Sequence, residues 1–261
     1  MREDRHIVGR RWRIIGDSVV GSSHRKTSSP CQDANRWSII ARGSGEVALA
    51  VLADGAGSAR WSRQGAAIAT RTVLRVLKPC ITDSENAAFD ANVLRAAIET
   101  ARETLVRAAE KRRRCVSEYA CTLLILVAMP DATFAAHIGD GAIVAENEDS
   151  LEVLSWPMQG EYANVTSFLT AHDVLENARI IDTRRVERFA LFSDGMQHLA
   201  LDYGERCAFK PFFEPMFAAV ADRTYERAHL QSALRSYLDS PTVNERTDDD
   251  KTLLLGARLH G

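Results

Sequence analysis

The stretch that decides the fold is Val47–Ala59, which reads Val-Ala-Leu-Ala-Val-Leu-Ala-Asp-Gly-Ala-Gly-Ser-Ala. Its first seven residues are all apolar, and such a run is typical of a strand that is buried on both faces. The run stops at Asp54, which Gly55 and Gly57 follow, so the chain turns where the carboxylate is presented. A charge at the mouth of a buried strand is costly unless a cation compensates it. The stretch therefore indicates either a plain Asp-Gly turn or a metal ligand.

Two later segments repeat this junction of apolar residues, an aspartate and a glycine. They are 135–141, Ala-Ala-His-Ile-Gly-Asp-Gly, and 189–195, Phe-Ala-Leu-Phe-Ser-Asp-Gly. Five acids in all lie near the edge of an expected strand: Asp33, Asp54, Asp140, Asp194 and Asp249. Carboxylates that converge from strand ends would form the oxygen-rich site that Mg²⁺ and Mn²⁺ prefer. Two such ions about 3.5–4 Å apart suit in-line hydrolysis of a phosphoester. The spacing alone also fits aspartates scattered over separate turns.

The composition is that of an ordinary globular protein. Of the 261 residues, 46% are hydrophobic and 26% are charged, and the net charge is −2. This balance argues against nucleic acid as a partner. No apolar run reaches membrane-spanning length, the first residues lack the apolar core of a signal peptide, and the five cysteines contain no Cys-x-x-Cys pair. We expect a cytoplasmic protein with reduced thiols and no membrane partner, folded as one domain over 1–261 with its core at about 12–259.

The apolar patterns predict the following elements. Strands are expected at 12–20, 37–41, 47–53, 121–128, 133–138, 142–146, 180–183, 188–192 and 253–259. Helices are expected at 62–77, where Pro79 ends the helix, and at 91–114, 212–221 and 225–238. The short turns within 121–146 favour an antiparallel meander of three strands. The polar segments 22–30 and 156–177 are expected to be loops, and the second is long enough for a functional flap.

Taken together, the motifs resemble those of the metal-dependent serine/threonine protein phosphatases of type 2C, in the same order. They are Gly21-Ser22-Ser23-His24, Cys31-Gln32-Asp33-Ala34, Ala53-Asp54-Gly55-Ala56-Gly57-Ser58, Ile138-Gly139-Asp140-Gly141, Ser193-Asp194-Gly195 and Asp249-Asp250-Lys251-Thr252. The segment 160–164, Gly-Glu-Tyr-Ala-Asn, through Phe168-Leu169-Thr170 resembles the flap of a bacterial branch of that family. Each motif alone is weak, but the resemblance covers about residues 12–259.

The resemblance implies an α+β fold, an αββα sandwich of two antiparallel β-sheets flanked by helices, with a metal cluster at one end. It implies a hydrolase that uses two Mn²⁺ or Mg²⁺ ions to remove phosphate from phosphoserine or phosphothreonine. Water or hydroxide held by both metals would attack the phosphorus directly, without a phosphoenzyme. The substrate would be a phosphorylated protein, and a serine/threonine kinase or its target is the partner that bacterial relatives suggest.

The same resemblance assigns roles to individual residues. Asp54 would bridge the two ions, and the Gly55 carbonyl would help to bind one of them. Asp194 and Asp249 would complete the first site, and Asp33 would hold a metal-bound water. The catalytic set is therefore Asp33, Asp54, Asp194 and Asp249. Asp140, together with Asp194, would bind a looser third ion.

Two departures from the family pattern concern catalysis and the third ion. Ala56 stands where many eukaryotic members carry a histidine associated with general-acid catalysis, and a metal-bound water or His24 is the candidate substitute. His198 stands four positions after Asp194, where the family often carries an acid linked to the third metal, which weakens the case for that ion.

A third departure concerns the phosphate. Ser28 stands near the place where some members carry a phosphate-binding arginine. Arg25 and Lys26, from the same loop, are the candidates to replace it.

Three other enzyme classes fit poorly. A methyltransferase would pair 52–58 with a second strand that ends in an acid roughly 20 residues on, where a helix is expected instead. A haloacid-dehalogenase-type phosphatase would need a hydrophobic strand before Asp248-x-Asp250-x-Thr252, yet 240–247 is polar. A cysteine phosphatase would need Cys-x5-Arg, which the chain lacks. The remaining alternative is a catalytically weak type 2C-like module that regulates or scaffolds a kinase signalling system.

Overall fold

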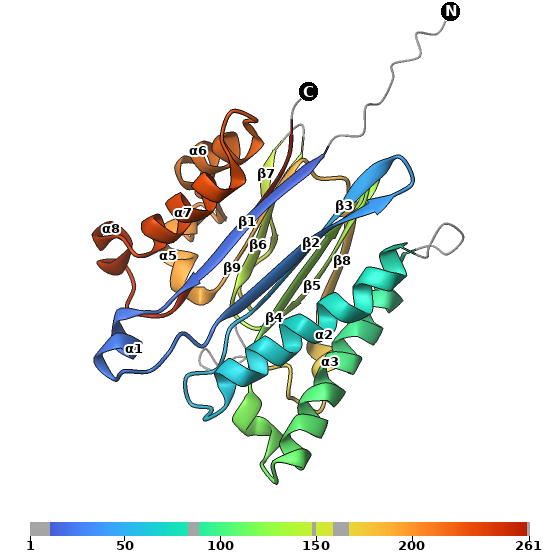
Figure 1. Cartoon of the computed structure of the whole chain (residues 1–261), viewed down its shortest axis with the longest axis vertical. Helices are drawn as coiled ribbons and strands as arrows, with labels where there is room; N and C mark the ends of the chain where they lie inside the picture. Colours follow the sequence, from blue (N-terminus) through green and yellow to red (C-terminus); the bar gives the residue numbers. More distant parts are fainter. Residues whose placement is uncertain (1–10, 83–88, 148–149, 159–166, 260–261) are drawn as a thin grey trace, which may run out of the picture.

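The structure is a computed structural model that describes residues 11–82, 89–147, 150–158 and 167–259. Two five-stranded antiparallel sheets pack against each other, and helices cover the outer side of each sheet (Figure 1). The predicted αββα sandwich, and with it the α+β class, is confirmed. Of the helices in these ranges, none combines the length and the apolarity that crossing a bilayer requires.

The first sheet has the strand order β1-β12-β9-β6-β7. Its strands are β1 (Trp12–Val19), β6 (Ala142–Glu146), β7 (Leu151–Ser155), β9 (Arg188–Phe192) and β12 (Lys251–Arg258). Four helices lie on its outer side (Figure 1): α5 (Gln197–Ala200), α6 (Lys210–Ala221), α7 (Arg227–Leu238) and α8 (Pro241–Asn244). Phe213 and Phe217 of α6 are fully buried against this sheet, so the apolar face of that helix holds the layer in place.

The second sheet has the strand order β2-β3-β4-β5-β8. Its strands are β2 (Ala34–Arg42), β3 (Gly45–Ala53), β4 (Leu123–Ala128), β5 (Ala132–Ile138) and β8 (Arg179–Arg184). Two long helices, α2 (Ser62–Thr82) and α3 (Ala91–Lys111), cover its outer face (Figure 1). Shorter elements connect these layers: α1 (Ser22–Lys26), η1 (Val116–Tyr119), α4 (Val174–Asn177), η2 (Asp194–Met196), β10 (Leu201–Asp202) and β11 (Cys207–Ala208).

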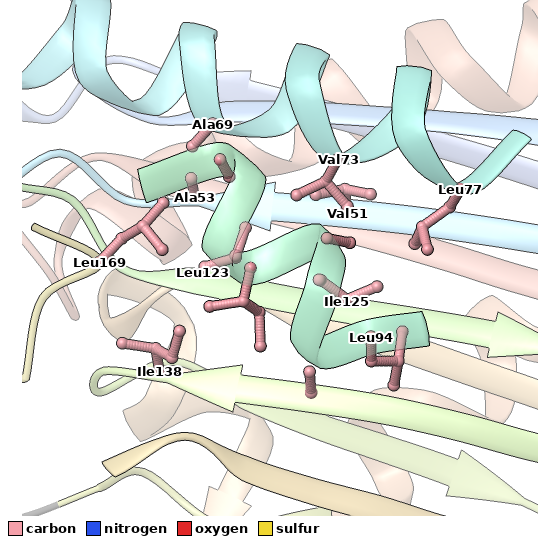
Figure 2. Packing of buried hydrophobic residues seen from close by; sticks show 14 of the residues in the cluster. Val51, Ala53, Ala69, Val73, Leu77, Leu94, Leu123, Ile125, Ile138 and Leu169 are labelled. Carbon is pink, nitrogen blue, oxygen red and sulfur yellow. The ribbon is translucent and has the colours of Figure 1, made fainter. Parts of the chain in front are cut away.

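The two faces of β3 explain its unbroken apolar run. Val47, Leu49, Val51 and Ala53 pack toward α2 and α3. Figure 2 shows Val51 and Ala53 below Ala69, Val73 and Leu77 of α2, beside Ile125 of β4. The alternate residues of β3, namely Ala48, Ala50 and Leu52, pack between the two sheets. The prediction of a strand buried on both faces is confirmed, and Asp54 lies at its carboxyl end.

Two predictions about the fold are wrong. Pro79 does not end α2, which continues to Thr82, because Ile81 is fully buried and holds the last turn against the core. The strands within 121–146 do not form one meander, since β6 pairs with β9 and β7 in the other sheet. The chain changes sheets at Gly139–Gly141, where Gly139 adopts a φ of +109°, a conformation that side chains disfavour.

The segments expected to be loops are partly helical. The polar segment 22–30 contains the helix α1, and the flap predicted at 156–177 ends in α4. The strand β7, which directly precedes that flap, was not predicted. The flap motif at 160–164 lies outside the described residues.

Candidate active site

Three of the predicted aspartates come together where the two sheets meet. Asp33 directly precedes β2, Asp54 directly follows β3, and Asp194 opens the turn η2 after β9. The charges of Asp33 and Asp194 both act on the Asp54 carboxyl and, together with burial, raise its pKa. The sandwich therefore joins acids from β2 and β3 of one sheet with an acid from β9 of the other.

A cavity of about 280 Å³ opens beside this cluster. Its lining includes five residues predicted from the sequence, which are Asp54, Gly55, Asp140, Asp194 and Asp249. The other lining residues are Ser23, His24, Ala56, Gly57, Ser58, Thr122 and Phe168.

Asp54 is held by pairing between its turn and the chain that leads into β4. Its backbone N–H donates to Thr122 Oγ1 at 2.9 Å, and the Thr122 N–H donates to the Asp54 carbonyl at 2.8 Å. The next residue, Gly55, forms a β-bridge with Cys121. A Cβ on Gly55 would lie 2.8 Å from the Gln32 carbonyl oxygen, so only glycine allows this close approach of the two backbones.

Asp33 is bound from the opposite side of the sandwich. One of its oxygens, Oδ2, accepts hydrogen bonds from Ser193 Oγ at 2.9 Å and from Thr252 Oγ1 at 2.7 Å. The Ser193 hydroxyl in turn accepts the Thr252 N–H at 3.0 Å. The other oxygen of Asp33, Oδ1, is buried and has no hydrogen-bond partner among the described residues.

The cluster concentrates negative charge in a buried space. Burial raises the pKa of Asp33 to about 7, and Asp250 adds to the rise. Burial, with the charges of Asp249 and Asp140, raises the pKa of Asp194 to about 6. The pKa of Asp54 is raised well above its usual range by burial and by the charges of Asp33 and Asp194. Such a group of carboxylates is unfavourable by itself and favourable around a cation.

The donor atoms fit a hard divalent cation. Asp33 Oδ1 and Asp194 Oδ1 are both buried without a hydrogen-bond partner in the described part of the chain. Within the same ranges, no group of three or more His, Cys, Asp or Glu side chains has the arrangement of a preformed metal site. Mg²⁺ usually keeps several water ligands and is bound through only one or two carboxylates. These residues therefore fit a partly hydrated ion rather than one in a closed protein cage.

Asp249 and Asp140 lie at the rim. Asp249 is exposed just before β12, and its Oδ1 accepts the Asp250 N–H at 2.7 Å. Asp140 is half-buried in the turn between β5 and β6, and its carbonyl accepts a hydrogen bond from the Gln197 side chain. His198, the next residue after Gln197, is exposed, and its ring lies 6.1 Å from that of Tyr203. A third ion at Asp140 stays a prediction.

The two candidate phosphate ligands lie apart from the acids. Arg25 forms an ion pair with Asp239 and lines a different cavity of about 550 Å³, together with Arg235. Lys26 is exposed at the end of α1. Neither Arg25 nor Lys26 is among the described residues that line the acidic cavity. Phosphate binding by these two residues stays a prediction.

A further acid, Asp250, was missed in the sequence. It is 2% exposed, and its carboxylate accepts the backbone N–H groups of Gly21 at 2.7 Å and Gln32 at 2.6 Å. Its Oδ2 also lies 2.9 Å from Nδ1 of His24. The run of three acids before the last strand was a usable signal, because strand alternation would turn only some of them inward.

Comparisons with known proteins identify the family of the chain. Residues 20–239 match the model of a family described as protein phosphatase 2C. The chain is 37% identical over 247 residues to Serine/threonine-protein phosphatase 3 of Escherichia coli (strain K12), covering 94% of this chain and 97% of that relative. The chain belongs to the protein phosphatase 2C family, and the predicted family is thereby confirmed.

Solved structures share the fold. A bacterial serine phosphatase has a TM-score of 0.63 at 17% identity, covering 97% of this chain and 99% of that chain. Serine/threonine phosphatase Stp1 from Staphylococcus aureus has a TM-score of 0.61 at 19% identity, covering 100% of both chains. The catalytic domain of the phosphatase PstP, solved with two manganese ions, has a TM-score of 0.61 at 16% identity, covering 95% of this chain and 99% of that chain.

Proposed function

We propose that this chain is a single-domain protein phosphatase that hydrolyses phosphoserine and phosphothreonine with the help of divalent cations. The observation that carries the proposal is that four carboxylates, those of Asp54, Asp140, Asp194 and Asp249, line one cavity. The serine/threonine specificity is supported by the E. coli relative, which is named a serine/threonine-protein phosphatase. The use of two cations is supported by PstP, which was solved with two manganese ions.

The residues of the cluster would divide the work as follows. Asp54 would hold both cations, the Gly55 carbonyl would help to bind one of them, and Asp194 and Asp249 would complete the first site. When bound, the cations supply Lewis-acid stabilisation of the phosphoryl charge and activation of water. Asp33 would orient the attacking water with Oδ1, because Ser193 and Thr252 already engage its Oδ2.

The choice of metal, the partner and the location follow from the family resemblance. We expect Mn²⁺ or Mg²⁺, with Asp140 as a ligand of any third ion. The substrate would be a phosphorylated protein of the cytoplasm, and a serine/threonine kinase or its target is the proposed partner. The alternative of a catalytically weak scaffold gains no support, because the cluster keeps its carboxylates and lies beside an open cavity.

Hydrolysis of a phosphothreonine peptide tests the proposal. We would compare turnover in EDTA, Mg²⁺ and Mn²⁺ for the unmodified protein and for the variants Asp54→Asn and Asp194→Asn. Turnover should require added metal and should fall at least about 100-fold in both variants. Asp131→Asn, in the exposed turn between β4 and β5, is the matched control and should change turnover less than twofold.

Two results would contradict the proposal. One is turnover that persists in EDTA or in both variants. The other is a folded protein that is inactive and binds no Mn²⁺ by calorimetry, which would favour the scaffold alternative.

A further inference from the structure

Hydrolysis of a phosphoserine or phosphothreonine ester releases an alkoxide, a poor leaving group unless it receives a proton. The cavity lining described by the structure contains carboxylates, hydroxyls, small residues, Phe168 and one imidazole, that of His24. The carboxylates of this lining, Asp54, Asp140, Asp194 and Asp249, are the proposed cation ligands, and serine and threonine hydroxyls are weak acids. Ala56, which lines the same cavity, has only a methyl group. Among the described lining residues, His24 is therefore the side chain best suited to donate this proton.

The position of Asp250 fixes which ring nitrogen of His24 can act. Nδ1 of His24 is buried and lies 2.9 Å from Oδ2 of Asp250. This approach is an ion-pair contact, and no described group forms a hydrogen bond with this nitrogen. Because the buried carboxylate engages Nδ1, Nε2 is left as the nitrogen that can face the cavity.

The carboxylate is itself held rigidly. Its Oδ1 accepts the Gly21 N–H, and its Oδ2 accepts the Gln32 N–H. The backbone N–H and the hydroxyl of Ser23 both donate to the Asp248 carbonyl, at 2.9 and 2.7 Å. A Cβ on Gly21 would lie 2.3 Å from the Asp249 carbonyl carbon, so α1 sits directly against the segment that carries Asp250. These contacts hold α1, which carries His24, against the segment that carries Asp250, and so they fix the position of the His24 ring.

We propose that His24 is the general acid for the leaving oxygen and that Asp250 positions it, an inference that rests on the proposed phosphatase activity. The bond between phosphorus and the serine or threonine oxygen breaks with its electron pair on that oxygen, which takes the Nε2 proton. The oxygen of the attacking water forms the new bond to phosphorus. One proton of that water stays on the product phosphate, and the other returns to the imidazole through solvent.

Leaving-group dependence distinguishes this role from a structural one. We would measure kcat of the full chain with Mn²⁺ on a phosphothreonine peptide and on p-nitrophenyl phosphate, whose phenolate leaves without a proton. His24→Gln should lower kcat on the peptide about 100-fold or more, and kcat on p-nitrophenyl phosphate less than about threefold. His229→Gln, an exposed histidine of α7, is the matched control and should leave both values within twofold.

A double variant tests the positioning role. Asp250→Asn should show the same preference for p-nitrophenyl phosphate as His24→Gln. The double variant should be no slower on the peptide than His24→Gln alone, because two residues that act as one unit are not additive. Thermal melting and p-nitrophenyl phosphate turnover show whether Asp250→Asn folds. If it does not fold, the result for His24→Gln alone decides whether the proposal holds.

The outcomes separate the two proposals. Equal losses on both substrates, or an unchanged kcat on the peptide in His24→Gln, would overturn the general-acid role while leaving the phosphatase activity intact. An unmodified protein that hydrolyses p-nitrophenyl phosphate but not the peptide would overturn the proposed serine/threonine specificity and the role of His24 together. Loss confined to the peptide in His24→Gln, with His229→Gln unaffected, is the result expected.

Discussion

Ser193 Oγ donates a 2.9 Å hydrogen bond to Asp33 Oδ2, and this bond joins the two sheets at the site. Ser193 follows β9 in one sheet, and Asp33 precedes β2 in the other. Thr252, in β12, donates to the same oxygen. The carboxylate is thus held through one oxygen while the other stays available to the acidic cluster.

Removing this bond should affect both stability and catalysis. Ser193→Ala leaves Asp33 with one donor fewer and removes the acceptor of the Thr252 N–H. We expect the free energy of unfolding to fall by about 1–3 kcal/mol, measured by urea denaturation. We also expect kcat on a phosphothreonine peptide to fall about tenfold, because the Asp33 carboxylate can then rotate. Ser117→Ala, at an exposed position in η1, should change stability by less than about 0.5 kcal/mol. An equal loss in the two variants would contradict a special role for the bond.

The metal-free protein should lose stability as the acids ionise. The folded-state pKa of Asp194 is about 6 and that of Asp33 is about 7, both above the unfolded values near 4. Their contribution to stability is therefore complete below about pH 4 and is lost as the pH rises through 6 and 7. Each pKa unit corresponds to about 1.4 kcal/mol.

A comparison with Asp54→Asn isolates the part that Asp54 contributes, because burial and the charges of Asp33 and Asp194 raise the pKa of Asp54 in the same direction. Burial lowers the pKa of His137 to about 3, so this residue titrates in the opposite sense, but it does so in both proteins and cancels in the difference. In EDTA, the unfolding free energy of the unmodified protein minus that of Asp54→Asn should decrease between pH 4 and 7. Added Mn²⁺ should reverse the decrease at pH 7. A difference that does not depend on pH would mean that the three carboxylates do not share a buried cluster.

Gly195 should not tolerate a side chain. A Cβ at this position would lie 2.1 Å from the backbone oxygen of Asp250, so either the turn after Asp194 or the start of β12 would have to move. Gly195→Ala should cost about 1–3 kcal/mol of stability and most of the phosphatase activity. Gly45→Ala is the matched control, because its nearest atoms would lie at an ordinary 3.8 Å. If Gly195→Ala keeps the melting temperature and turnover of the unmodified protein, the turn after Asp194 and the start of β12 do not pack as closely as described.

Arg25 offers a test of phosphate binding. Its ion pair with Asp239 is exposed, at 45% and 46% for the two side chains, and such pairs contribute at most about 1 kcal/mol. The guanidinium can therefore leave Asp239 for a substrate phosphate at little cost. Arg25→Gln should raise KM for the phosphopeptide about fivefold with little change in kcat, and Asp239→Asn should lower KM. An unchanged KM in both variants would assign phosphate binding to other groups, and Lys26→Gln would be the next variant to measure.

The flap predicted at 156–177 should influence the choice of substrate. Phe168 lines the acidic cavity, and the next residue, Leu169, is fully buried, with its N–H donating to the Cys121 carbonyl at 2.8 Å. Phe168→Ala should change the relative kcat/KM of peptides that differ beside the phosphothreonine about fivefold, with little effect on p-nitrophenyl phosphate. Tyr225→Ala, an exposed aromatic position after α6, should leave the ranking unchanged. If the ranking of peptides by kcat/KM is unaltered both in Phe168→Ala and after replacement of the whole flap, the flap does not select the substrate.

The local sequence determined the elements and the acids at their ends. The run before Asp54 is apolar at every position because both faces of β3 are buried, and the limits predicted for β9, 188–192, match the structure. Asp54, Asp194 and Asp33 were identified because turn chemistry and strand length are local properties that a single segment displays.

Only the tertiary structure decided which elements became neighbours. The sequence of β6 does not indicate that this strand pairs in the other sheet rather than with β5. The sequence of α2 does not show that the helix continues beyond Pro79 to bury Ile81. The approach of His24 to Asp250 joins the first and last parts of the chain through α1 and β12. Strand pairing and buried polar contacts depend on how separate segments jointly remove apolar surface from water, and no single segment contains that information.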